Sequence, residues 1–435
     1  MTTPGTLAGR TVLRFAHAFE SGGGTERYLD DLDAALLERN AMTIVRLHLT
    51  RNPVAGGPIE TPAGRGRLIR IPLPILPANG SPPASDPGPL RDGWKQRVRD
   101  WGLYHPLVWR LAGARWAAAR RLVPQPGQAV GAGPAAAEVF HARQVDLVMM
   151  HYFGGADADE VVVEARKAGV PYAVLNHYAN DRFLHLAIRK HVLTASGVAG
   201  VNGLGLPRHV RQGFTNVSDG IDAAFFRREN ARPLADAPGQ PVVLLPARVV
   251  REKGQMDLVR AAAQLRQSGV ECCLAFAGRV DSSGFVGELQ QEIARAGMTG
   301  CVRFLGEINV PELRDWYAAS AVVALPTYHH EGLPRIILEA QAMGVPVVAY
   351  ATGGVADGIA SGRTGFLLPT GDVAGLADRL RELLASSSLR TAMGACGREM
   401  VETRFTLAAL AERHERFYAQ IIAAAKTTGI KVSAG

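Results

Sequence analysis

Cysteine is scarce in this sequence, and long apolar runs are absent. Four cysteines occur among 435 residues, and their spacing fits neither a disulfide framework nor a zinc site. The first residues lack the apolar core of a signal peptide, and nowhere do about 18 apolar residues follow one another without interruption. We therefore expect reduced cysteines in the core and a cytoplasmic protein, attached to a membrane at most peripherally.

The usual marks of a nucleic-acid-binding protein are also missing. The sequence has no zinc-finger spacing, no aromatic RNA-binding signature and no lysine-rich tail. The formal net charge is nevertheless +8, which also suits an anionic membrane or a phosphorylated ligand. We expect no nucleic acid among the partners of this chain.

Composition and patterning predict a globular α/β protein. Hydrophobic residues make up 47% and charged residues 20%, which is enough apolar material for full cores, and the length suits two or three domains. Short apolar runs alternate with helical patterns, as in parallel sheets covered by helices. The expected strands are 11–17, 42–49, 67–73, 145–151, 171–177 and 197–202 in the first half, and 241–248, 271–278, 301–306, 321–326, 345–350 and 365–369 in the second.

A polar, proline-rich segment divides the chain. Residues 227–240 are the natural linker, so we place the boundary near 222–240. This gives an N-terminal domain at 1–222 and a C-terminal domain at 223–405. After Phe405, residues 406–425 have the pattern of one long amphipathic helix, which we expect to pack back toward the N-terminal domain.

Two glutamates, Glu331 and Glu339, flank an expected helix start at Pro334. Eight residues span a little over two helical turns, so Glu339 is expected on or near the Glu331 side. The amide N–H groups of Gly332 and Leu333 precede the helix and would form an anion cradle beside the carboxylates. The alternative is an ordinary helix with an acidic first turn and a glutamate at the edge of the core.

A second cluster of charge follows the strand at 241–248. Arg248 stands at the carboxyl end of this strand, and Lys253 precedes Gly254 and a new helix. Ligands of open α/β sheets bind at the carboxyl ends of the strands, and two cations there suit a diphosphate. The alternative is a solvated basic turn.

A glycine run, Gly22 to Gly24, lies between the first strand and the helix at 25–40. Glycine lets the backbone approach a ligand closely at the positive end of a helix. The run departs from G-x-G-x-x-G, so a dinucleotide-binding fingerprint is not supported.

Together these motifs resemble the retaining GT-B glycosyltransferases of family 4 (group 1). The resemblance rests on the basic pair, the two glutamates, and the segments at 217–226 and 353–372, which occur in the expected order. It is specific over about 240–405 and weaker over 1–220. It implies an α/β GT-B fold, in which two Rossmann-like domains face each other across a cleft.

The resemblance also implies roles in the second half of the chain. Arg248 and Lys253 match the basic pair that neutralises the departing diphosphate of the donor. Glu331 matches the glutamate that lies against the donor sugar, and Glu339 matches the one that binds the ribose hydroxyls. The amides of Gly332 and Leu333 would contact the phosphate.

Further roles are implied near the first domain. Gly23 and Gly24 resemble the glycine loop that closes over the donor, and His177 matches a histidine that approaches the reacting sugar, with His151 as its rival. Asp219 stands where relatives often carry asparagine, which changes a sugar or phosphate contact. The loop at 277–284 also departs from the family pattern, so the contacts to the nucleobase are left open.

The function implied is transfer of a hexose-type sugar from a nucleoside-diphosphate sugar to an acceptor hydroxyl, with retention. The acceptor would be a glycan, glycolipid or small molecule, as in the synthesis of surface polysaccharide, lipopolysaccharide or glycolipid. Such enzymes need no cofactor and no metal, although His329 and His330 stand beside Glu331. The alternatives are a nucleotide-sugar epimerase or phosphorylase on the same fold, and an inactive donor-binding scaffold of an assembly complex.

Residues 91–122 form a basic segment that is rich in tryptophan. Helices with a basic face and a tryptophan face bind anionic membrane surfaces, so we expect this segment to bring the enzyme to the inner membrane face. The alternative is that the tryptophans pack on the core of the first domain. The tryptophans concerned are Trp94, Trp101, Trp109 and Trp116.

Overall fold

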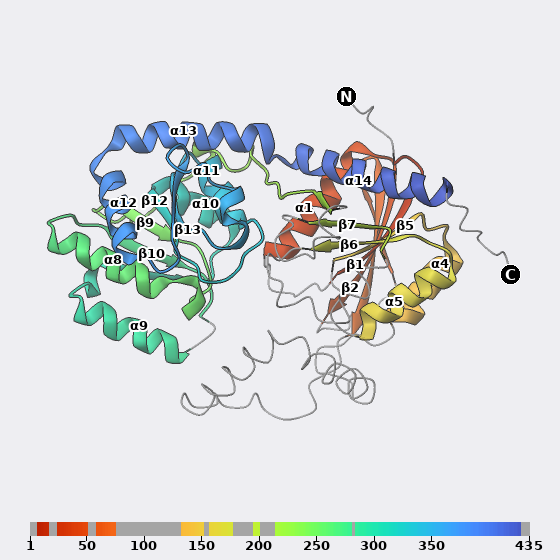
Figure 1. The fold of residues 1–435 in the computed structure, drawn as a ribbon, viewed down its shortest axis with the longest axis horizontal. Helices are drawn as coiled ribbons and strands as arrows, with labels where there is room; N and C mark the ends of the chain where they lie inside the picture. The colour runs from red at the N-terminus through yellow and green to blue at the C-terminus, as the bar shows by residue number, and fades with distance from the viewer. Residues whose placement is uncertain are drawn as a thin grey trace.

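The structure is a computed structural model that describes residues 7–16, 24–50, 58–74, 132–151, 156–176, 195–200, 214–280 and 283–427. Within these ranges the chain forms two separate sheets, each with helices on both faces, which confirms the expected α/β class (Figure 1). His177, Gly23 and the segment 91–122 lie outside the described residues, so the predictions on them stay predictions.

The first sheet has strand order β3-β4-β2-β1-β5-β6-β7-β8. Its neighbours pair in parallel, except for the antiparallel hairpin of β3 and β4. The strands are β1 (Thr11–Ala16), β2 (Thr43–Thr50), β3 (Ile59–Ala63), β4 (Gly66–Pro74), β5 (Leu147–Met150), β6 (Tyr172–Asn176), β7 (Gly197–Gly200) and β8 (Phe214–Asn216).

The second sheet has strand order β11-β10-β9-β12-β13-β14 and is parallel throughout. All six strands expected in this half of the sequence are confirmed. They are β9 (Val242–Leu245), β10 (Cys273–Ala277), β11 (Val302–Gly306), β12 (Ser320–Leu325), β13 (Val347–Tyr350) and β14 (Gly365–Leu368).

Each face of each sheet buries an apolar cluster beneath helices. The first sheet packs on α1 (Gly24–Arg39) and α14 (Leu407–Thr427) on one side, and on α4 (Ala132–Ala142) and α5 (Ala156–Lys167) on the other. The second sheet packs on α8 (Gln255–Gln267), α9 (Ser283–Arg295) and α12 (Val373–Ala385) on one side. Its other face packs on α10 (Val310–Ala319), α11 (Arg335–Ala342) and the end of α13 (Ser387–Arg404). The one-turn helices are η2 (Arg228–Asn230), η3 (Arg251–Lys253), η4 (Thr299–Cys301) and η5 (Gly353–Asp357).

The last helix of the second domain leads directly back to the first. Figure 1 shows α13 along the second domain and α14 continuing across the first. Buried polar contacts attach α14 there: the Tyr418 hydroxyl accepts from Arg14 Nη2 at 3.2 Å, and Tyr28 Oη lies 2.7 Å from His414 Nε2. Because buried polar groups are costly without partners, these contacts fix the position of α14 more specifically than apolar packing alone.

Both sheets change strand order at one strand, which positions the site. In the first sheet β1 lies between β2 and β5, and in the second β9 lies between β10 and β12. Crevices in open parallel sheets form beyond the carboxyl ends of strands at such points. In the second sheet these ends lead into residues 246–254 and 326–334.

Two strands of the first sheet, β3 and β8, were not predicted from the sequence. The edge strand β3 is exposed and contains a proline, and β8 is only three residues long, so neither has the apolar run by which the other strands were recognised.

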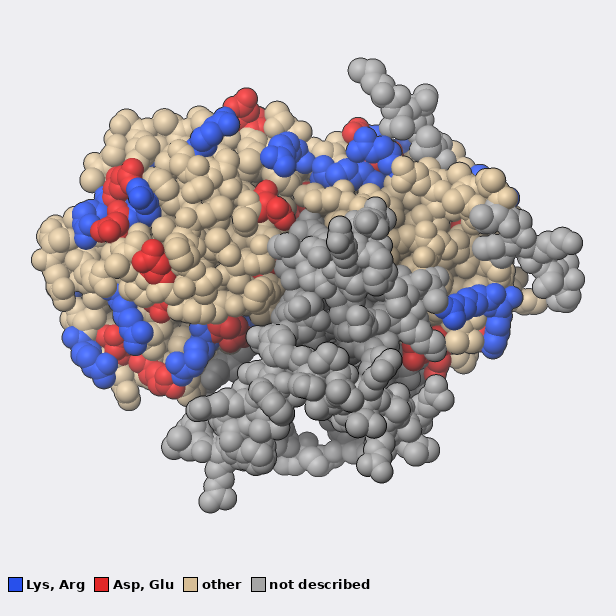
Figure 2. Space-filling view, viewed as in Figure 1, with Lys and Arg blue, Asp and Glu red and all other residues tan. Residues whose placement is uncertain are grey.

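On the face shown in Figure 2, acidic and basic side chains of the second domain, on the left, are interspersed. None of the helices in the described ranges is long and apolar enough to span a membrane.

Candidate active site between the two sheets

The basic loop after β9 is packed against the loop after β12. Gly254 has φ +79°, and a Cβ there would come within 1.9 Å of the Pro326 carbonyl oxygen, so this close approach requires glycine. The Glu252 carbonyl accepts from Thr327 Oγ1 at 3.1 Å and from the Tyr328 amide at 2.8 Å. These contacts bring the two predicted charge clusters together.

Lys253 forms an ion pair with Glu331 across these two loops. The side chains are only 14% and 19% exposed, respectively, and His329 Nδ1 lies 3.6 Å from Glu331 Oε1. Burial opposes ionisation of Glu331, but the contacts with His329 and Lys253 together outweigh it and lower its pKa to about 2. Glu331 is therefore an ionised acceptor at neutral pH.

Arg248 lies in the loop that follows β9, five residues before Lys253. Its side chain is exposed, and its carbonyl accepts from Gln255 Nε2 at 2.8 Å. A Cβ at Gly278 would come within 2.3 Å of the Ala247 carbonyl oxygen, so the end of β10 packs tightly on the same loop. The backbone that carries Arg248 is thus held from two sides.

The predicted amide cradle precedes α11, which begins at Arg335 with Pro334 as its N-cap, one residue later than expected. Within the described parts of the chain, the amides of Gly332 and Leu333 donate no hydrogen bond. The Leu333 side chain is buried against Gly358. A Cβ added at Gly358 would lie 2.7 Å from Leu333 Cδ1. The side chain thus anchors a turn whose amides are available to an anion.

Glu339 is fully buried and already has two hydrogen-bond donors. Tyr317 donates to Oε2 at 2.9 Å, and Arg27 of α1 donates from Nη1 to Oε1 at 3.0 Å. Arg27 belongs to the first sheet's helix layer, so this contact joins the two domains. A ribose at Glu339 would have to share the carboxylate with Arg27 or displace it.

A second ion pair runs beside the first. Asp31 and Arg335 are ion-paired, and Arg335 Nη1 also donates to Asp219 Oδ1 at 3.2 Å and to the Gly220 carbonyl at 3.1 Å. Arg27 and Asp31 are four residues apart on α1, as Arg335 and Glu339 are on α11, so each pair shares one helix face. We call these four residues the interdomain clasp.

Asp219 lies at the junction of the domains rather than in open solvent. It is 6% exposed, and its Oδ1 accepts from the Gly220 amide at 2.6 Å. Burial, assisted by the charges of Asp31 and Glu339, raises its pKa to about 6, although Arg335 and the Gly220 amide oppose this. Its carboxylate is engaged with the clasp, and its predicted role in donor binding stays a prediction.

On the first-domain side, Gly24 begins α1, and His151 follows β5 at the carboxyl end of the sheet. His151 is 6% exposed, with Nε2 at 3.2 Å from Arg14 Nη1. Because a guanidinium only donates, Nε2 accepts and the ring proton lies on Nδ1. Within the described residues, no three His, Cys, Asp or Glu side chains gather as metal ligands.

Four charged residues of this region were not predicted from the sequence: Arg27, Asp31, Arg335 and Arg14. Opposite charges four residues apart on two expected helices were a usable signal. What was missing was any indication that the two helices face each other.

Comparison with known proteins identifies the second domain. The model of the family described as glycosyl transferases group 1 matches residues 226–400. These residues belong to that family. Within this group 1 domain lie Arg248, Lys253, Glu331 and Glu339.

Curated relatives match mainly over part of their length. A D-inositol 3-phosphate glycosyltransferase of Pseudarthrobacter chlorophenolicus is 35% identical over 181 residues, which is 40% of this chain and 43% of that protein. A GDP-mannose-dependent monoacylated alpha-(1-6)-phosphatidylinositol monomannoside mannosyltransferase of Corynebacterium glutamicum is 29% identical over 213 residues, or 46% of this chain and 54% of that protein. The chain thus matches about half or less of the length of these relatives.

Solved structures match over nearly the whole chain. Sucrose-phosphate synthase of Thermosynechococcus elongatus aligns with a TM-score of 0.68 at 20% identity, covering 95% of this chain and 100% of that one. Anabaena HepE, solved in complex with UDP and glucose, aligns with a TM-score of 0.65 at 17% identity, covering 94% and 100%. At this identity the likeness concerns the fold, and it confirms the expected GT-B architecture of two Rossmann-like domains.

Proposed function

We propose that this protein transfers a hexose-type sugar from a nucleoside-diphosphate sugar to an acceptor hydroxyl, with retention of the anomeric configuration. The observation that carries the proposal is the contact of Lys253 with Glu331 at the switch point of a group 1 domain, where the loop after β9 also carries Arg248. The UDP complex of HepE supports a nucleotide donor.

The chemistry follows from where charge develops. As the sugar departs, negative charge grows on the leaving diphosphate, and preorganised cations and amides stabilise it. Lys253, Arg248 and the amides of Gly332 and Leu333 are suited to this. Donor phosphate would compete with Glu331 for Lys253, which ties diphosphate binding to the orientation of Glu331.

Glu331 suits a binding role rather than proton transfer. With a pKa lowered to about 2, it holds no proton to donate at neutral pH and accepts hydrogen bonds from sugar hydroxyls. We propose a front-face route in which the leaving phosphate takes the proton of the acceptor, so that retention requires no covalent glycosyl-enzyme. His177 would approach the reacting sugar, and no metal or cofactor takes part.

The test is release of nucleoside diphosphate from UDP-, GDP-, ADP- and TDP-sugars without acceptor. We expect slow release with one donor and thermal stabilisation by that donor, unaffected by EDTA. Lys253→Ala should lower turnover by about 10²–10³, the effect of removing one preorganised charge. Lys167→Ala, which removes an exposed lysine paired with Glu164, is the matched control.

Three outcomes would contradict the proposal. An isomerised sugar nucleotide would indicate an epimerase, and donor binding without turnover, even with acceptor, would indicate a scaffold. If the protein neither binds nor turns over any of these donors, the site does not bind a nucleotide sugar. Equal turnover in Lys253→Ala and the wild type would remove the diphosphate role.

We further propose a membrane-linked acceptor in glycolipid or surface-glycan synthesis, with 91–122 binding anionic lipid. The name of the Corynebacterium relative supports a glycolipid acceptor. Co-sedimentation with anionic liposomes should weaken with salt and fall when Trp94 and Trp101 are both changed to Ala. Equal recovery in the supernatant with and without liposomes, at low salt, would refute the membrane part alone.

A further inference from the structure

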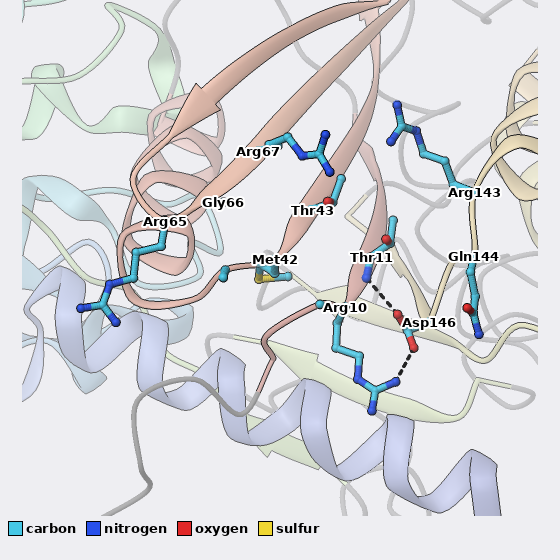
Figure 3. A pocket seen from close by; sticks show the side chains of 12 residues that line it. Arg10, Thr11, Met42, Thr43, Arg65, Gly66, Arg67, Arg143, Gln144 and Asp146 are labelled. Carbon is cyan, nitrogen blue, oxygen red and sulfur yellow. Dashed lines mark hydrogen bonds and ion pairs between the residues drawn. The ribbon is translucent and has the colours of Figure 1, made fainter.

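A polar hollow lies at the end of the first sheet opposite the candidate site. It has a volume of about 530 Å³ and opens where β1, β2 and β4 begin (Figure 3). The candidate site lies toward the carboxyl ends of the strands, so the hollow is separate from it. The polar and charged residues that line it are Arg10, Thr11, Thr43, Arg65, Arg67, Arg143, Gln144 and Asp146.

The lining offers many donors and few acceptors. Among the described residues that line the hollow, Asp146 is the only carboxylate, and both of its oxygens are engaged. Oδ1 accepts from Arg10 Nη1 at 2.7 Å, and Oδ2 accepts from the Thr11 amide at 2.9 Å. The remaining guanidiniums, hydroxyls and amide suit a ligand that is rich in acceptors and negatively charged.

Arg67 and Arg143 already converge on one carboxylate. Arg67 Nη1 lies 3.1 Å from Glu60 Oε1, and Arg143 Nη2 lies 3.7 Å from Glu60 Oε2. In Figure 3 the two guanidiniums lie near each other above Thr11 and Thr43. The Glu60 side chain is 41% exposed, and exposed ion pairs contribute little, so an incoming oxyanion could replace it.

The backbone that carries Arg67 is held firmly. Gly64 has φ +55°, and a Cβ there would come within 2.7 Å of Glu38 Cα. At Gly66 a Cβ would come within 2.2 Å of the Met42 carbonyl oxygen, which also accepts from the Arg67 amide at 3.0 Å. The hairpin of β3 and β4 is therefore locked against β2 and α1, whereas Arg65 points away from the hollow (Figure 3).

We propose that this hollow binds a phosphate group of a phosphate ester, between Arg67 and Arg143 and above the hydroxyls of Thr11 and Thr43. Guanidinium forks match phosphate oxygens in pairs. The volume exceeds what a single phosphate ion needs, which leaves room for the group it esterifies. A soluble phosphate ester and a phospholipid headgroup share this chemistry, and the proposal does not depend on the function of the cleft.

The test measures binding of glycerol 3-phosphate to the full chain by calorimetry. The double variant Arg67→Ala/Arg143→Ala should lose at least tenfold in affinity, since hydrogen bonds between charged groups commonly contribute that much. The double variant Arg67→Lys/Arg143→Lys keeps the charge without the fork and should be intermediate. It also supplies the answer if the alanine variant fails to fold.

Two controls separate this site from other binding. Arg379→Ala/Arg381→Ala removes the same charge from two exposed ion pairs of α12 and should bind as the wild type does. Lys253→Ala should also bind normally. Loss in Lys253→Ala with retention in the Arg67/Arg143 variants would place the ligand in the cleft, and equal loss in the α12 variant would reduce the effect to net charge. Either result overturns the proposal.

A vesicle arm distinguishes the two sources of phosphate. Binding to phosphatidylglycerol vesicles, but not to phosphatidylcholine vesicles, that falls in Arg67→Ala/Arg143→Ala would identify a lipid headgroup. Binding of glycerol 3-phosphate that depends on the two arginines, with vesicle binding unchanged, would identify a soluble ester. If neither depends on Arg67 and Arg143, the proposal is refuted.

Discussion

The interdomain clasp allows a quantitative prediction of how much the contact of Arg27 with Glu339 contributes to the free energy of unfolding. Glu339 is fully buried, and Arg27, 26% exposed, donates to it at 3.0 Å. Removing one partner of a buried ion pair costs about 3–5 kcal/mol. Glu339 would retain the Tyr317 hydroxyl and the nearby charge of Arg335, so we expect Arg27→Met to destabilise the protein by the lower figure, about 3 kcal/mol.

A double-mutant cycle isolates the pair. We expect Arg27→Met and Glu339→Gln, alone and combined, to give a coupling free energy of about 1.5–3 kcal/mol in urea unfolding. Because the contact joins two domains, Arg27→Met should also separate their unfolding into two transitions. The exposed pair Arg379–Glu382, treated in the same way, should give less than about 1 kcal/mol.

A coupling free energy between Arg27 and Glu339 below about 0.5 kcal/mol, which is within the range of independent sites, would refute this expectation. Equally strong coupling in the exposed control pair would refute the importance assigned to burial. The first result would mean that this contact does not hold the domains together in solution.

Three further predictions concern the loop, the junction and the donor. Gly254→Ala should lower the Tm more than Gly269→Ala does. Both glycines have φ near +80°, so the backbone strain of alanine is the same at both. At Gly254 the new Cβ also meets the Pro326 carbonyl oxygen, whereas at Gly269 it meets nothing within 4 Å. Equal shifts in Tm would contradict the close approach at Gly254. The pKa of Asp219 is raised from 3.8 to about 6, so its ionisation costs stability as pH rises between these values, up to about 3 kcal/mol. Asp219→Asn should remove that loss, and parallel stability curves for both proteins from pH 4 to 7 would contradict it. Glu339→Ala should raise the donor KM more than it lowers kcat; unchanged binding of nucleoside diphosphate would remove its ribose role.

Local sequence patterns predicted the elements of this fold better than its contacts. Five of the six strands of the second sheet are almost wholly apolar, because helices cover both faces of that sheet, and the edge strand β11 is interrupted by Arg303. The approach of Lys253 to Glu331 was foreseeable for a related reason. Both follow strands that meet at one edge, so the order of the sheet alone brings them together.

The clasp could not be predicted in the same way. Arg27 and Glu339 are 312 residues apart, and their contact depends on how two independently folded domains sit against each other. Nothing local in either helix encodes that placement. The edge strand β3 was missed for another reason, since an exposed antiparallel edge has no apolar run by which to recognise it.

One carboxylate links the two levels of this structure. Glu339, predicted to bind the donor ribose, is also the group that Arg27 of the other domain holds. A carboxylate has about four acceptor positions, so Arg27, Tyr317 and a ribose hydroxyl can share it. Each additional hydrogen bond to the carboxylate weakens the others. Such coupling is reciprocal. If ribose binds at Glu339, the factor by which donor loosens or tightens the clasp equals the factor by which Arg27→Met changes donor affinity through that contact. The affinity for the sugar donor and the stability of the domain contact would then both report on the interaction of Arg27 with Glu339.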